Sequence, residues 1–143
     1  MYRILRFEKW VVIIIAFLLF SVSDAASQPL DYGAEDLEEL QGLCERGDAV
    51  GCAGLGVLYF KGAGVTQNYE KATALFRQAC KDGAARGCTD LGSMYVRGVR
   101  PEEAIGFSLE KDYARARILY GKGCDEGDAI GCINSRSLRK TDQ

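Results

Sequence analysis

A short phrase that occurs three times decides the fold of this chain: CERGDAVGC at residues 44–52, CKDGAARGC at 80–88 and CDEGDAIGC at 124–132. All six cysteines of the chain lie in these phrases. In each copy one glycine stands three residues after the first cysteine, and another directly precedes the second cysteine. A cysteine pair written with this regularity indicates a repeated structural unit.

The similarity between the copies extends well beyond the cysteines. The period is 36 residues from Cys44 to Cys80 and 44 residues from Cys80 to Cys124. Periods of roughly 20 to 50 residues are typical of solenoids, in which short supersecondary units stack on one another. The extra residues of the longer period fall between Val96 and Lys111, where we expect a longer surface loop.

Apolar residues recur at three- and four-residue steps before each phrase and after the first two, as expected for one face of a helix. Before the second phrase they are Tyr69, Ala72, Leu75, Phe76, Ala79 and Cys80. We expect helices over residues 34–46, 48–61, 68–82, 84–97, 111–126 and 128–139. The predicted fold class is therefore all-α, an alpha-alpha superhelix (solenoid) of three helical hairpins.

The glycines within the phrases mark the predicted turns. Gly47, Gly83 and Gly127 fall where the first helix of each hairpin should end, a position that commonly requires a left-handed backbone. Asp48 and Asp128 can cap the returning helices, whereas the equivalent Ala84 cannot, so the middle hairpin should have the weaker cap. The two cysteines of each phrase then face each other across an antiparallel helix pair.

The N-terminus has the layout of a secretory signal peptide. Basic residues precede an apolar run at residues 10–20, and small residues follow it. Cleavage between Ala25 and Ala26 places small side chains where a signal peptidase requires them. The alternative is an uncleaved anchor, but counted to Val22 the run has only 13 residues, too few for a hydrocarbon core of about 30 Å.

We therefore expect a signal peptide at residues 1–25, a linker at 26–32, three repeats at 33–139 and a tail at 140–143. The mature chain would be secreted or periplasmic, without stable membrane insertion. Cleavage removes three of 18 basic and two of 20 acidic residues, which leaves a net charge of about −3. This charge gives no indication of nucleic-acid binding.

In an oxidising compartment, disulfides are the leading interpretation of the cysteines. Structural zinc sites usually place two to four residues between paired cysteines, whereas seven separate them here. Catalytic redox cysteines usually lie at an exposed helix start, whereas these lie within apolar helix faces. We expect no metal and no cofactor.

The repeated unit resembles the Sel-one-like repeat (SLR), a relative of the tetratricopeptide repeat (TPR), over nearly all of residues 33–139. The residues that carry the resemblance are Leu55-Gly56, Leu91-Gly92, the tyrosines that follow them, Lys71-Ala72, Arg115-Ala116 and the loop at 62–65. Cysteines eight positions apart look like the cysteine-rich secreted branch of that family. The resemblance implies a disulfide within each hairpin: Cys44 with Cys52, Cys80 with Cys88 and Cys124 with Cys132.

That branch is often labelled penicillin-binding or weakly β-lactam-hydrolysing, so a beta-lactamase-type hydrolase is the alternative function. The chain contains no His, which removes His-based triads, His acid–base catalysis and His metal ligands. Ser108 and Lys111 form an S-x-x-K string, but the partner motifs of such enzymes are missing. We expect no catalytic residue, and whether the chain is an enzyme stays open.

The resemblance implies a concave face that binds a protein or peptide. We expect the first helices of the hairpins to line it, because their sequences vary between copies while the repeat frame stays fixed. The candidate contact residues are Thr73, Arg77 and Gln78 in one copy and Arg117, Gly121 and Lys122 in the next. The sequence therefore predicts an interaction scaffold.

Overall fold

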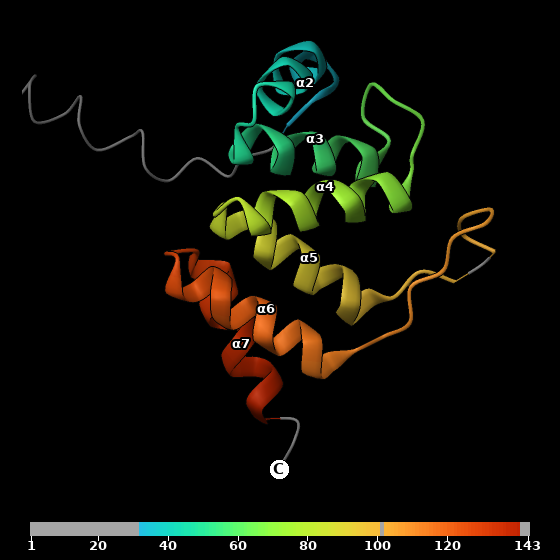
Figure 1. Ribbon diagram of the computed structural model, residues 1–143. Helices are drawn as coiled ribbons and strands as arrows, with labels where there is room; N and C mark the ends of the chain where they lie inside the picture. The colour runs from blue at the N-terminus through green and yellow to red at the C-terminus, as the bar shows by residue number, and fades with distance from the viewer. Residues whose placement is uncertain (1–31, 101, 141–143) are drawn as a thin grey trace, which may run out of the picture. The chain divides into compact units, whose positions relative to one another are not determined.

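The computed structural model describes residues 32–100 and 102–140. The predicted signal peptide, the linker up to residue 31 and the tail from residue 141 lie outside these residues. A 3₁₀ helix η1 (Ala34–Asp36) comes first, followed by α2 (Leu37–Glu45), α3 (Ala49–Lys61), α4 (Tyr69–Lys81), α5 (Ala85–Arg97), α6 (Tyr113–Asp125) and α7 (Ala129–Lys140). Successive helices lie side by side from α2 to α7 (Figure 1). The predicted all-α stack of three hairpins is confirmed.

The glycine turns of the three hairpins share one geometry. Gly47, Gly83 and Gly127 have φ angles of 85°, 92° and 102°. In the first hairpin, Gly47 N–H donates to the carbonyl of Cys44 at 3.0 Å and Asp48 N–H donates to that of Leu43 at 3.0 Å. The other two hairpins repeat this pair of bonds. It is the Schellman arrangement, which ends a helix and satisfies two of its last carbonyls.

The glycine before the second cysteine has a different role, because it lets the two helices approach closely. A Cβ atom on Gly87 would lie 2.6 Å from Cβ of Ala79, and one on Gly131 would lie 3.0 Å from the backbone nitrogen of Cys124. The Cα atoms of the paired cysteines are accordingly only 4.4, 4.4 and 4.5 Å apart. Disulfides join Cys44–Cys52, Cys80–Cys88 and Cys124–Cys132, as the resemblance implied.

The caps of the return helices differ as the sequence predicts. The Asp48 carboxylate accepts from Gly51 N–H at 2.8 Å, and the Asp128 carboxylate accepts from Gly131 N–H at 3.0 Å. Ala84 occupies the same position in the middle hairpin and provides no side-chain hydrogen bond. The middle hairpin therefore relies more on its disulfide and on packing.

The Leu-Gly-x-x-Tyr stretches form the contacts between one hairpin and the next. A Cβ atom on Gly56 would lie 2.6 Å from the Phe76 ring, and one on Gly92 would lie 2.9 Å from the Tyr120 ring. Each glycine therefore makes room for an aromatic ring of the following helix. Phe76 and Tyr120 are buried in the same hydrophobic core.

Cations and aromatic rings connect the helices at the end opposite the disulfides. Lys71 lies 4.1 Å from the centre of the Tyr59 ring and donates to its hydroxyl at 2.7 Å. Arg97 lies 4.6 Å from the centre of the Tyr69 ring, and Arg115 lies 5.1 Å from that of Tyr95. The three pairs join α3 to α4, α4 to α5 and α5 to α6.

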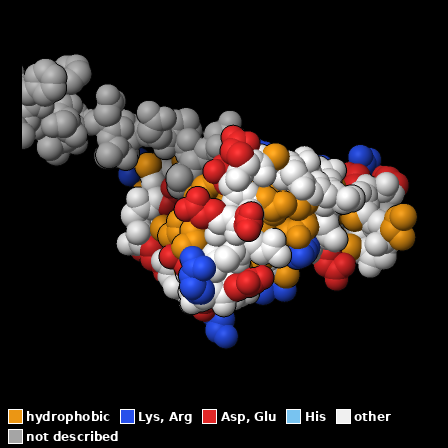
Figure 2. Space-filling model, turned by 90° about the horizontal axis from the view of Figure 1, so that it is seen from above, with side chains coloured by type: hydrophobic (Ala, Val, Ile, Leu, Met, Phe, Trp, Pro, Cys, Tyr) orange, Lys and Arg blue, Asp and Glu red, His pale blue; other side chains and the backbone are white. Residues whose placement is uncertain are grey.

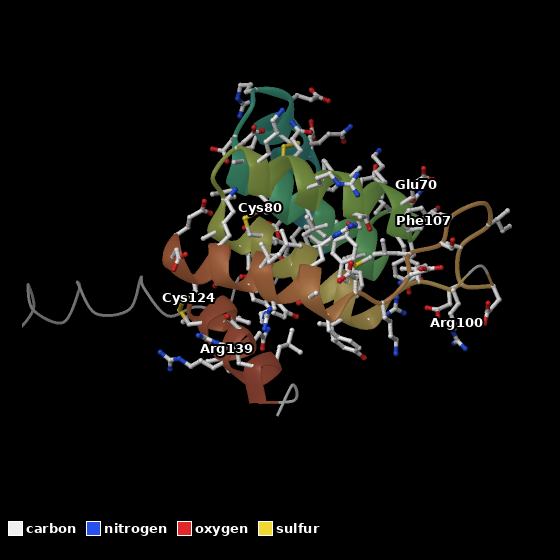
Figure 3. All side chains as sticks on the ribbon, turned by 60° about the horizontal axis from the view of Figure 1, so that its bottom comes forward. Glu70, Cys80, Arg100, Phe107, Cys124 and Arg139 are labelled. Atoms are coloured by element: carbon white, nitrogen blue, oxygen red, sulfur yellow. A yellow bond between two sulfur atoms is a disulfide. The ribbon has the colours of Figure 1, made fainter. Side chains whose placement is uncertain are left out.

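The predicted long loop connects α5 to α6 at this end. Val99 and Leu109 exchange backbone hydrogen bonds of 2.8 and 2.9 Å, which closes the loop at its base. Figure 3 shows Arg100 and Phe107 on this loop, and Cys80 and Cys124 at the other end of the helices. No helix within residues 32–100 and 102–140 is both long and apolar enough to cross a membrane.

Replacing the middle disulfide, Cys80–Cys88, tests how strongly one disulfide stabilises the fold. Closing a nine-residue loop stabilises by about 2.5 kcal/mol when unfolded-chain entropy dominates. We expect Cys80→Ser with Cys88→Ser to lower the free energy of unfolding by about this amount, measured by urea denaturation followed by circular dichroism. An unchanged denaturation midpoint would contradict a stabilising role.

Two buried threonines offer a matched test of hydrogen-bond satisfaction. Thr73 and Thr89 are 2 % and 1 % exposed. The Thr73 hydroxyl donates to the carbonyl of Tyr69 at 2.7 Å, whereas the Thr89 hydroxyl has no partner among the described residues. An unsatisfied buried hydroxyl costs about 1 kcal/mol or more. Thr89→Val should therefore raise the free energy of unfolding by about 1 kcal/mol, and Thr73→Val should lower it. Denaturation shifts of the same sign in both variants would contradict this assignment.

Candidate functional site

The second helices of the hairpins form a row of their own. α3 contacts α5 and α5 contacts α7, in addition to the contacts between helices adjacent in sequence. The first helices α4 and α6 pack chiefly against their sequence neighbours. We call α3, α5 and α7 the inner row, because direct contact draws these helices together.

A groove of about 320 Å³ lies in the inner row between α3 and α5. Its apolar lining comes from Val57 and Phe60 of α3, Met94 of α5 and the Phe76 ring, which reaches it from α4. Its polar lining consists of Lys61, Arg86, Asp90, Ser93 and Arg97. An apolar lining with a few oriented polar groups is the usual composition of a ligand site.

One polar wall of the groove is an ion pair along α5. Arg86 Nε donates to both carboxylate oxygens of Asp90, at 2.9 and 3.0 Å. Burial raises the pKa of Asp90, and the Arg86 charge and hydrogen bond oppose the rise. The carboxylate is therefore desolvated but held in a fixed orientation.

The Ser93 hydroxyl has its hydrogen-bond partners inside the protein. It donates to the carbonyl of Thr89 at 3.1 Å and lies 3.1 Å from the Tyr120 hydroxyl. Since Ser93 uses its proton on Thr89, Tyr120 is the donor of the second bond. Burial raises the pKa of Tyr120, which keeps this hydroxyl protonated.

Arg97 lies between the groove and a second depression, of about 600 Å³, along the 98–111 loop. Its guanidinium donates to the Tyr69 hydroxyl at 3.2 Å and to Glu103 at 2.8 Å. Ser108 and Lys111 also line this loop depression. Both are exposed, and within the described part of the chain no hydrogen bond joins them. The S-x-x-K string thus gains no support as a hydrolase site.

A third depression, of about 240 Å³, lies at the α2 end. Tyr32, Leu40, Leu43 and Val50 supply its apolar lining, and Asp36, Glu39 and Asp48 supply carboxylates. Figure 2 shows this end from above, with acidic side chains around hydrophobic patches. The acidic surface contrasts with the groove, where three of the four charged residues are basic.

The predicted contact residues lie on first helices and do not line the groove. Thr73 is buried, which removes it from the candidate set. Arg77, Gln78 and Arg117 are exposed. Lys122 is exposed too, but its ammonium group donates to the carbonyl of Cys80 at 2.8 Å and thereby caps the end of α4.

Variation between the repeat copies, which selected the candidates on the first helices, could also have found the groove residues if it had been applied to the second helices. Positions that vary between copies also occur on the second helices: Gly54, Asp90 and Asn134 align, and so do Val57, Ser93 and Ser137. The sequence does not tell which row of helices is the inner one. That property depends on how the hairpins pack.

Metal and thiol chemistry are not apparent in the described residues. All six cysteines are in disulfides. Among residues 32–100 and 102–140, no group of three or more His, Cys, Asp or Glu side chains is arranged to hold a metal ion.

These features define an α-helical repeat protein with disulfide-linked hairpins and an inner groove. The Sel1 repeat family matches residues 49–83 and 85–128, more than half of the 143 residues. The chain belongs to the Sel1 repeat family. Each match joins a second helix to the first helix of the next hairpin, so Cys80–Cys88 connects the two matched repeats.

Solved structures share the fold. A Sel1 repeat protein from Oxalobacter formigenes is 22 % identical with a TM-score of 0.58, over 71 % of this chain and 39 % of that one. The protein c5321, a protective antigen of uropathogenic Escherichia coli with an SLR fold, is 25 % identical with a TM-score of 0.56. That match covers 69 % of this chain and 20 % of c5321. No curated protein is significantly similar in sequence.

The raised pKa of Asp90 predicts a pH-dependent stability. Between the ordinary Asp pKa of 3.8 and the higher value in the fold, the native state binds more protons than the unfolded state, so stability falls as pH rises. Asp90→Asn should remove this fall, and Arg86→Gln should steepen it because the opposing charge is lost. Chemical denaturation at several pH values from about 3.5 to 7 measures both. An identical pH profile for Asp90→Asn and the wild type would contradict the assignment.

Proposed function

We propose that this chain is an extracytoplasmic scaffold that binds a protein or peptide in the groove between α3 and α5. The observation that carries the proposal is the groove itself, with Val57, Phe60 and Met94 between charged groups. An extended segment could place apolar side chains against this lining while its backbone meets Asp90 and Ser93. Sel1 repeats generally bind proteins, which supports the same function.

The rigidity of the groove supports a binding role. Arg86 and Asp90 hold each other, and Ser93 is held by Thr89 and Tyr120. The Cys80–Cys88 disulfide fixes the start of α5, from which most polar groove residues project. A preformed site binds with a smaller loss of conformational freedom.

Two observations support secretion or periplasmic export. Three disulfides indicate an oxidising environment, and residues 1–25 have the composition of a signal peptide. In this proposal the signal peptide is cleaved after Ala25 and residues 26–32 form a linker. The repeats span residues 33–139, and a short tail follows them.

Site-specific photo-crosslinking tests which face binds the partner. A photoreactive amino acid at Lys61 samples the groove, and one at Gln78 samples the outer surface of α4. In cells that export the chain, we expect one crosslinked product from position 61 and none from position 78. Ser93→Trp, which fills the groove, should reduce that product about tenfold, corresponding to roughly 1.4 kcal/mol of binding.

The double variant Arg77→Glu with Arg117→Glu serves as the matched control, because both residues are exposed and neither lines the groove. It should leave the crosslinked product unchanged. If it abolishes the product while Ser93→Trp does not, the partner binds on the first helices and the groove assignment is wrong.

A further inference from the structure

The two ends of the helical stack carry opposite charges. α2 and α7 form these ends, at the top and the bottom of Figure 1. At the α2 end, four of the six side chains of residues 34–39 are carboxylates. The charged residues of α7 are Arg136, Arg139 and Lys140, all of them basic. Opposite charges at the two ends of one chain favour contact between the end of one copy and the start of another.

α7 also exposes apolar side chains. Ile130 is 46 % exposed and Ile133 is 60 % exposed, and the two lie one turn apart on the helix. A terminal helix that only caps a stack of repeats has a polar outer face. The apolar pair beside the basic residues is therefore better suited to a protein contact than to water.

The repeat register shows which positions would meet in such a contact. The cysteines align α7 with α3 and α5, and they align α2 with α4 and α6. Within the chain a second helix packs on the following first helix twice, α3 on α4 and α5 on α6. A third contact of this kind would place α7 of one copy on α2 of a second copy.

The position of the tyrosine–cation pairs provides the first complementary pair. Tyr95 of α5 accepts from Arg115 of α6 at 3.2 Å, and a tyrosine–lysine pair joins α3 to α4 at the same positions. The equivalent residues at the ends are Arg139 in α7 and Glu35 just before α2, and both are exposed. Arg139 donates through Nε to the carbonyl of Ser135 at 3.4 Å, and its guanidinium has four further N–H groups. Opposite charges would therefore face each other here.

The position of the interhelical glycine provides a second pair of opposite charge. A Cβ atom on Gly92 of α5 would lie 3.3 Å from the carbonyl oxygen of Ala116 in α6, so these two positions face each other. The equivalent residues are Arg136 in α7 and Asp36 before α2. Arg136 is exposed, and the Asp36 carboxylate is held by the N–H of Gly33 at 2.9 Å. A second ion pair can therefore form beside the first.

A third position is apolar on both helices. A Cβ atom on Gly123 of α6 would lie 2.5 Å from the hydroxyl oxygen of Thr89 in α5. The equivalent residues are Ile133 in α7 and Leu43 in α2, and Leu43 is partly exposed. Three positions of α7, each three residues after the last, therefore meet complementary side chains at the α2 end.

We propose that the chain associates head to tail, with α7 of one copy packed on α2 of the next, so that the superhelix continues across the contact. Arg136 and Ile133 are larger than the glycine and threonine of α5, so the two helices lie farther apart than α5 and α6 do. One helix pair buries less than the roughly 1,200 Å² typical of stable complexes. The association is therefore reversible and depends on concentration.

This contact joins two different surfaces of identical chains, so it is heterologous and can add further copies unless the ring closes. None of its residues lines the groove between α3 and α5. The proposal therefore stands or fails independently of peptide binding in that groove.

Sedimentation equilibrium of the exported protein tests the proposal. We expect the weight-average mass to rise with concentration up to about 1 mM, and to fall when salt is raised from about 0.05 to 0.5 M. Arg139→Glu and Glu35→Arg should each weaken association about tenfold, because repulsion replaces an ion pair. Both residues are exposed, so circular dichroism should show an unchanged fold.

An equimolar mixture of the two variants separates this contact from a general charge effect. In the mixture, Arg139→Glu supplies an unaltered α2 end and Glu35→Arg supplies an unaltered α7, so association should return. Glu38→Arg is the matched control, because its equivalent Ile118 is 70 % exposed and turned away from the preceding helix. It should associate like the wild type.

Three results would overturn the proposal: a protein that stays monomeric up to about 1 mM, association that both charge reversals leave unchanged, or a mixture that associates no better than either variant alone.

Discussion

The close approach of two helices at each cysteine phrase is the constraint on which the rest of the structure depends. A glycine with positive φ ends the first helix, and a second glycine removes the Cβ atom that would hold the return helix away. Only then do the cysteine Cα atoms come within about 4.5 Å, close enough for a disulfide. The three features act together, so losing either glycine would displace the sulfur atoms as well as the turn.

The two ends of the helices are held by different interactions. At the end with the cysteine phrases, tight turns and disulfides hold the helices together. At the opposite end, where the connections between hairpins differ in length, cation–tyrosine pairs hold them. In a repeat protein, stability is approximately the sum of unit and interface contributions. Cys80–Cys88 crosses the boundary between the two matched repeats, so it contributes to the interface between them.

Local features were predictable from the sequence, and features that depend on packing were not. The helices, the glycine turns and the missing cap at Ala84 follow from residues close in the chain. The position of the groove could not be predicted in this way. The helices α3 and α5 are separated in the sequence by α4, and they become neighbours only when the hairpins pack. Thr73 shows the same limit: its variability suggested a contact residue, but the hydroxyl donates to the backbone one turn earlier, which allows full burial.

The central claim is that the two cysteines of each phrase form a disulfide with each other, within one hairpin. Peptide mapping of the exported protein without reduction, after cleavage between the three phrases, tests it most directly. The account predicts three linked products, joining Cys44 to Cys52, Cys80 to Cys88 and Cys124 to Cys132. A peptide that links cysteines of different phrases, such as Cys44 with Cys80, would contradict it.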